Sequence, residues 1–264
     1  GELMMVGAYT TFVVQECFKV YVPAHLFDTY FLLAMPLSFV VAGVAGLLLE
    51  VGLIRFLYGR PLETLLATWG VSLILIQAAR KTFGDLTAVA SPNWLSGGLQ
   101  LMVGVQLPYN RLFILALSSA CVTGMYLLLF RTQMGLKVRA VTQNRAMSAC
   151  LGVSTRRVDA GAFALGAGLA GLAGCALTQV GNVDPALGQN YIVDSFLVVV
   201  TGGVGKLAGT ALAALGIGGL NKLLEPGFGA IYAKILILFL VIVFLQRRPA
   251  GLFVTRGRHA ESEG

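Results

Sequence analysis

The sequence predicts an all-α protein, a single domain over residues 1–264 in which about eight helices cross a membrane. The composition is 57% hydrophobic with only 12% charged residues, and the mean hydropathy is +0.82, whereas soluble domains carry about 25% charged residues. Uncharged apolar runs at 29–49, 112–130 and 160–183 are each long enough to span a bilayer, which takes roughly 18 residues. Lys and Arg residues gather at the ends of such runs, as the positive-inside rule expects.

The predicted membrane segments follow the apolar runs in order. They lie at about 2–18, 30–54, 64–79, 111–130, 158–180, 190–205, 207–224 and 229–246. Two segments near the end hold a charge, Asp194 in one and Lys234 in the other. The stretch after the 205–209 turn is short and rich in Gly and Ala, so a re-entrant loop is an alternative there. Because Gly1 lies inside an apolar segment, with no initiator Met or signal peptide before it, we expect that the natural N-terminus is missing.

The distribution of charge predicts the orientation. If 131–157 is cytoplasmic and the segments alternate, then 55–63, the turn at Lys206 and the tail 247–264 are cytoplasmic too. These stretches hold most of the 19 Lys and Arg residues, which supports this orientation. The long loop 82–110 then lies outside.

Small residues predict close packing between helices. A bilayer gives helices no hydrophobic drive to associate, so they approach closely where their side chains are small. Ala162, Gly166, Ala170 and Gly174 recur every four residues in one predicted segment. This spacing predicts a compact bundle rather than separate membrane anchors.

The sequence shows no catalytic residues, no metal site and no cofactor site. The stretch Gly203–Ala208 fits the pattern G-x-G-x-x-A, but a phosphate-binding loop would need Gly in place of Val200 and Ser or Thr in place of Leu207. The four cysteines lack C-x-x-C spacing, so neither a metal nor a disulfide framework is indicated. The pI near 9.4 reflects charges at the ends of membrane segments, and we expect no nucleic-acid partner. An intramembrane enzyme stays an alternative, although its helices hold few acids or bases.

Three stretches resemble one family, the permeases of branched-chain amino-acid-type ABC transporters. Gly1–Tyr9 resembles the end of the family's opening motif, Gly135–Val153 its cytoplasmic coupling loop, and Val199–Thr210 its late glycine-rich segment. The three stretches occur in the family's order and span almost the whole chain. The Asn and His that precede the opening motif in the family are absent before Gly1.

Within this family, Arg60–Gly70 and Arg247–Phe253 look most like the urea transporter permease. The resemblance implies a permease subunit of an ABC importer that forms the path for urea and takes part in nitrogen uptake. A permease for branched-chain amino acids is the alternative, because such permeases share much of the same pattern. A passive channel is a more distant alternative.

The resemblance also implies the partners and the location. We expect a second homologous permease subunit, two cytoplasmic ATPase subunits that use the ATP, and an extracytoplasmic solute-binding protein. The chain itself is expected to be a multi-pass protein of the bacterial inner membrane, in contact with lipid.

Polar groups inside the apolar runs are candidates for the solute path. A carboxylate at bilayer depth is costly and therefore marks function, and Glu2 shares a helix face with Val6 and Tyr9. The alternative is that Glu2 lies at the membrane surface. Neutral polar groups dominate, which favours a neutral solute, whereas an amino acid needs partners for both charges. The candidate path residues are Glu2, Tyr9, Thr10, Thr68, Asn182, Asp194 and Ser195.

The basic segment 131–157 is the candidate contact with the ATPase subunits. It is polar and helix-compatible, and it contains no run long enough to cross the bilayer. A basic anchor that touches only lipid headgroups is the alternative. By resemblance, the coupling residues are Arg139, Asn144, Arg145, Ala149 and Gly152.

Overall fold

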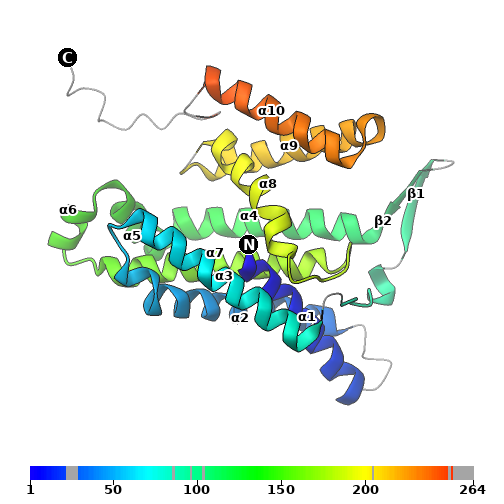
Figure 1. The fold of residues 1–264 in the computed structure, drawn as a ribbon, viewed down its shortest axis with the longest axis horizontal. Helices are drawn as coiled ribbons and strands as arrows, with labels where there is room; N and C mark the ends of the chain where they lie inside the picture. Colours follow the sequence, from blue (N-terminus) through cyan, green and yellow to red (C-terminus); the bar gives the residue numbers. More distant parts are fainter. Residues whose placement is uncertain are drawn as a thin grey trace. The chain divides into compact units, whose positions relative to one another are not determined.

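A computed structural model of the chain describes residues 1–21, 29–84, 87–95, 97–102, 105–203, 205–248 and 251. Helices make up most of this part (Figure 1). They are α1 Glu2–Tyr21, α2 Tyr30–Gly52, α3 Pro61–Phe83, α4 Tyr109–Arg131, α5 Gln133–Gln143, α6 Arg145–Cys150, α7 Thr155–Leu177, α8 Leu187–Gly202, α9 Leu207–Phe228 and α10 Ala230–Arg247. Most of the predicted tail 247–264 and both histidines, His25 and His259, lie outside the described residues.

The prediction of an all-α polytopic membrane protein is confirmed. Within the described residues, six helices are long and apolar enough to cross a membrane: α2, α3, α4, α7, α9 and α10. The two other predicted segments also form helices. Of these, α1 carries Glu2, Glu16 and Lys19, and α8 is only 16 residues long.

The loop between α3 and α4 contains the strands of the structure. Strands β1 (Gly98–Met102) and β2 (Val105–Pro108) pair as a short antiparallel hairpin. An isolated bridge joins Thr87 to Val183 and ties this loop to the segment that follows α7. Two single turns of 3-10 helix, η2 (Ile54–Phe56) and η3 (Asn93–Leu95), complete the described elements.

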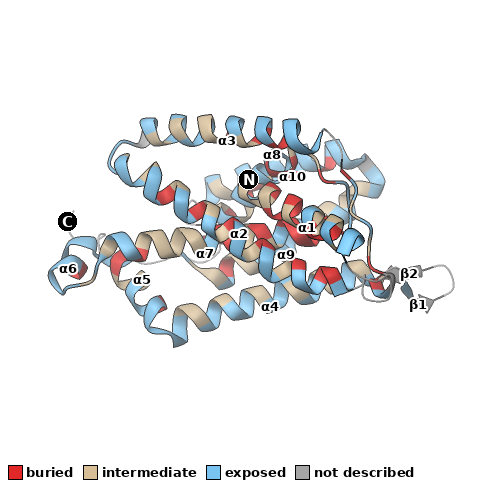
Figure 2. Cartoon of the chain, turned by 90° about the horizontal axis from the view of Figure 1, so that it is seen from below, coloured by how far each residue is buried: buried red, intermediate tan, exposed pale blue. Residues whose placement is uncertain are grey.

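The contacts divide the chain into two compact units, Gly1–Gln189 and Asn190–Gly264. In the first unit, α1, α2 and α7 pack around one another, and most of the buried residues lie on them (Figure 2). The faces of α4, by contrast, expose apolar side chains, which suits a helix in contact with lipid or another subunit. The core of the first unit therefore lies mainly between these three helices, and Ile76 and Ala79 of α3 pack against α1.

Glycines bring the backbones of α1 and α7 into direct contact. A Cβ on Gly7 would collide with the backbone of Gly171, and one on Gly174 would collide with the Met4 carbonyl. The predicted stripe of small residues at every fourth position is not the packing face of α7, because Gly166 is exposed and a Cβ added there would contact no other atom within 4 Å. Steps of four residues drift around a helix that has 3.6 residues per turn. The packing face instead alternates steps of four and three, through Ala167, Gly171 and Gly174.

The second unit contains most of α8 with α9 and α10. Leu197, Ile237 and Val241 form its buried cluster. Between α8 and α9, Gly203 and Gly205 have φ values of +96° and +90°, which side chains rarely adopt. A Cβ on the neighbouring Gly202 would lie 2.6 Å from the Gly209 backbone. The glycine-rich segment therefore makes a tight turn between two helices.

Candidate solute and partner sites

A partly buried carboxylate lies at the start of α1. Glu2 Oε1 accepts a hydrogen bond of 2.6 Å from Ser72 Oγ, and the Glu2 side chain is only 17% exposed. Ser72 lies in the middle of α3, so the carboxylate lies at mid-helix depth of a predicted membrane segment. The hydrogen bond satisfies one oxygen of this carboxylate and joins α1 to α3.

Tyr9 and Thr10 line an apolar cavity of about 450 Å³ between α1, α2 and α3. The Tyr9 ring stacks on Phe83 with 4.7 Å between ring centroids. The Thr10 hydroxyl donates a hydrogen bond of 2.8 Å to the Val6 carbonyl of the same helix, so its proton is not available to a solute in the cavity. The cavity offers few polar contacts to a solute.

A hydroxyl cluster in the core of the first unit did not emerge from the sequence as a site. The Ser38 hydroxyl donates to the Gly7 carbonyl at 3.0 Å and lies 3.2 Å from the hydroxyl of Thr11. Both side chains are fully buried, so they join α1 to α2 rather than face a solute. Residue type alone does not distinguish such a tie from a lining residue.

Two candidate path residues lie apart from these groups. Thr68 is exposed on α3, and its hydroxyl bonds the Leu65 carbonyl. Asn182 is exposed in the segment between α7 and α8, outside the helices. Neither side chain lines the cavity of Tyr9 and Thr10.

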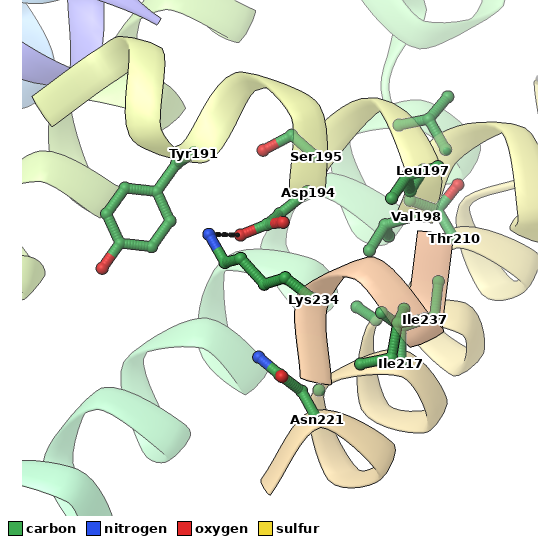
Figure 3. A pocket seen from close by; sticks show the side chains of 13 residues that line it. Tyr191, Asp194, Ser195, Leu197, Val198, Thr210, Ile217, Asn221, Lys234 and Ile237 are labelled. Atoms are coloured by element: carbon green, nitrogen blue, oxygen red, sulfur yellow. Dashed lines mark ion pairs between the residues drawn. The ribbon is translucent and has the colours of Figure 1, made fainter. Parts of the chain in front are cut away.

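The second unit contains a cavity of about 500 Å³ with an ion pair in its wall. Lys234 Nζ on α10 lies 3.0 Å from Asp194 Oδ2 on α8 (Figure 3). Ser195, Tyr191 and Asn221 also line this cavity, and the rest of the lining is largely apolar. Two candidate path residues, Asp194 and Ser195, therefore share one cavity. Lys234 was not among the candidates, although its charge within an apolar run was a usable signal.

The α5–α6 segment forms two short helices with defined ends. The Thr132 side chain accepts from Gly135 N at the start of α5, and the Asn144 side chain accepts from Met147 N at the start of α6. At the end of α6, Gly152 has a φ of +82°, and Val153 N donates to Ser148 O at 3.0 Å. This is a glycine C-cap of the Schellman type. Asn144 and Gly152 thus define the ends of α6, while Ala149 is exposed on it.

A cluster of charged and aromatic side chains fastens α6 to the first unit. Arg145 Nη2 donates to Asp159 Oδ2 on α7 at 2.6 Å, and its guanidinium lies 5.1 Å from the centre of the Tyr58 ring. Tyr58 in turn donates to the buried carboxylate of Glu50 on α2 at 2.9 Å. Partial burial, with the bond to Glu50, raises the pKa of Tyr58 to about 12. We call these four residues the α6 anchor.

Arg139 on α5 lies over the Phe130 ring, with 4.9 Å between its Cζ and the ring centre. This contact fastens α5 to the end of α4. In the part of the chain that the structure describes, no group of three or more His, Cys, Asp or Glu residues could hold a metal ion.

The fold and these sites define a multi-pass membrane protein with a short helical segment outside its spanning helices. The chain belongs to the family described as "Branched-chain amino acid transport system / permease component", whose model matches residues 1–245. It is thus a transport permease component and a multi-pass protein of the bacterial inner membrane.

Curated relatives cover most of the chain. It is 28% identical to the high-affinity branched-chain amino acid transport system permease protein BraD of Pseudomonas aeruginosa, over 96% of this chain and 83% of that protein. It is 25% identical to the probable branched-chain amino acid transport permease protein LivH of Methanocaldococcus jannaschii, over 96% and 81%. It is 28% identical to the ribose import permease protein RbsC of Bacillus subtilis, over 66% and 58%. No solved structure matches the chain.

Proposed function

We propose that this chain is a permease subunit of an ABC importer, which forms part of the membrane path for a small nitrogen-containing solute. A second homologous permease completes the path, two cytoplasmic ATPase subunits drive it, and an extracytoplasmic binding protein delivers the solute. The α5–α6 segment carries this proposal. Its two helices are too short to span a membrane, and the segment is basic. Side chains cap the starts of α5 and α6, and the ion pair of Arg145 with Asp159 fastens α6 to α7.

The α5–α6 segment is the proposed contact with an ATPase. Because α6 is fastened through Arg145 to α7 and, through Tyr58, to α2, a force on α6 acts on two helices of the core. Ala149 on α6 and Leu151 just after it are exposed. We assign the direct contact to exposed residues of α6 and the positioning of the helix to Arg139, Asn144, Arg145 and Gly152.

Branched-chain amino acids are the first candidate solutes. Two of the relatives above are named for the transport of these amino acids. The cavity of the second unit also offers what such a solute needs: a carboxylate, an ammonium group and apolar walls. Asp194 and Lys234 thus supply a partner for each of the two charges of an amino acid.

Urea is the second candidate. Its support is the resemblance of Arg60–Gly70 and Arg247–Phe253 to the urea transporter permease. Neutral hydrogen-bonding groups in the same cavity, on Tyr191, Ser195 and Asn221, suit a neutral solute that both donates and accepts.

Uptake assays test the proposal. Proteoliposomes would contain this permease, its partner permease and both ATPases, with the binding protein supplied and labelled leucine or urea outside. We expect ATP-dependent accumulation of leucine. Accumulation of urea alone would move the assignment to the second candidate. Equilibration of either solute without ATP would contradict an importer.

A further inference from the structure

We propose that Asp194 and Lys234 form a solute-binding site in the second unit, for a solute that presents N–H donors and an oxygen acceptor close together. The proposal rests on the proposed function and names the atoms that would hold its solute.

The pair is costly where it lies. Asp194 is on α8 and Lys234 is on α10, both within apolar helices of a membrane protein. Ionisable side chains within apolar helices of a membrane protein are expensive and are therefore candidates for a functional role. A role beyond joining two helices is therefore expected of them.

The pair also keeps unused hydrogen-bonding positions. An ammonium group has three donors, and a carboxylate has about four acceptor positions. The contact of 3.0 Å between Lys234 Nζ and Asp194 Oδ2 uses one of each. The Lys234 side chain remains 52% exposed and the Asp194 side chain 38% exposed. Both groups can therefore bind a solute without first separating.

The surroundings fit a small molecule. The cavity of about 500 Å³ lies within the range of roughly 300–1,000 Å³ that is common for small-molecule sites. Figure 3 shows Tyr191 and Ser195 on the α8 side of the pair and Asn221 beside Lys234. Leu197, Ile217 and Ile237 supply the apolar part of the wall, where an aliphatic side chain can lie.

Two solutes satisfy the same chemistry. The ammonium group of an α-amino acid would donate to Asp194, and its carboxylate would accept from Lys234. Urea would donate its N–H groups to Asp194 and accept from Lys234 through its carbonyl oxygen. The site thus requires a donor and an acceptor on neighbouring atoms of one small molecule, and the two solutes become separate arms of the test.

The first experiment measures binding to the assembled complex of permeases and ATPases in nanodiscs, without the binding protein. Saturation-transfer NMR would detect leucine and urea in separate samples. Asp194→Asn and Lys234→Gln are each expected to lower the signal of the bound solute at least fivefold. Lys222→Gln is the matched control, because Lys222 forms an exposed ion pair with Glu225 in the same unit. An equal signal in all variants would overturn the site.

The second experiment separates binding from a structural tie. The exchange Asp194→Lys with Lys234→Asp keeps an ion pair, and Asp194→Asn with Lys234→Gln removes both charges. If the pair only joins α8 to α10, the exchanged variant, which keeps the ion pair, transports at the wild-type rate, and the neutral variant loses uptake only together with thermal stability. If the pair binds solute, uptake falls at least tenfold in the neutral double variant while thermal stability stays within a few degrees of wild type.

A third measurement does not depend on these variants folding. Ser195→Cys leaves both charges in place, and alkylation of this cysteine by a small maleimide can be followed by mass spectrometry. We expect leucine or urea to slow its alkylation at least threefold. Unchanged alkylation with both solutes overturns the site, even if the wild type transports them. Failure of wild-type uptake with protection intact would instead reject the importer and leave the site standing.

Discussion

Replacing Arg145 by Gln tests whether the α6 anchor couples the partner subunits to the core helices. The substitution removes the ion pair of 2.6 Å with Asp159 and the contact of 5.1 Å with the Tyr58 ring. Because Arg145 is half exposed, the ion pair is worth no more than about 1 kcal/mol. The cation–π contact adds about 0.5–1 kcal/mol.

The expected effect follows from the size of α6. A helix of six residues is not stable by itself, so its position depends on its ties to the rest of the protein. A loss of about 1–2 kcal/mol lowers the equilibrium constant between correctly placed and displaced α6 by roughly 5- to 30-fold. We expect uptake to fall by more than twofold and by at most this factor, whereas membrane insertion stays normal and the ATP hydrolysed per solute rises.

The assay measures uptake and ATP hydrolysis in the same proteoliposomes. Arg156→Gln is the control, because Arg156 is an exposed cation in the first turn of α7, near the same surface. Asp159→Asn should behave like Arg145→Gln, and the two together should cost no more than either alone. Uptake by Arg145→Gln within twofold of the Arg156→Gln control would refute the reasoning.

Three further predictions concern other parts of the chain. Gly152→Ala places a side chain at a φ of +82°, which should destabilise the C-terminal end of α6 by about 1 kcal/mol. We expect a severalfold loss of uptake at normal expression, measured by uptake assays paired with immunoblots. The pKa of Tyr58 is about 12 in the folded protein, above its ordinary value of 10. The stability that the protonated Tyr58 side chain contributes is therefore complete below pH 10 and is lost as the pH rises towards about 12. In thermal melts over this pH range, the melting temperature of Tyr58→Phe should fall less than that of wild type. Gly7→Leu should abolish stable membrane insertion, because a side chain at this position meets the Gly171 backbone. Gly70→Leu is the control and should insert normally, because the space around Gly70 is open. Equal insertion of the two variants would contradict the packing of α1 against α7.

Sequence reasoning located the helices well because apolar runs are long and uninterrupted. The predicted segment 30–54 corresponds to α2, and 111–130 corresponds to α4, with ends that differ by a few residues. The basic segment 131–157 was also identified as a separate feature, and it contains α5 and α6. Both results follow from one-dimensional signals, which are run length and charge.

The sites were harder to predict because they depend on contacts between distant segments. Asp194 was identified as a candidate path residue, whereas its partner Lys234 was noted as a charge within an apolar segment and was not assigned to the path. Arg145 was predicted to contact an ATPase, but its contacts with Asp159 and Tyr58 could not be predicted, because they join separate elements of the chain. The predicted role of Glu2 is still untested, although its bond to Ser72 shows that α1 and α3 meet at this depth.

The contact of Gly7 with Gly171 restricts how the transporter can move. Where two backbones touch with no side chain between them, sliding one helix along the other brings a Cβ into the opposite main chain. Helices α1 and α7 therefore tilt together as a rigid body rather than shear past each other. The distance between spin labels on α1 and α7 should stay constant throughout the ATP cycle. The motions that admit and release solute would then occur between other helices of the subunit.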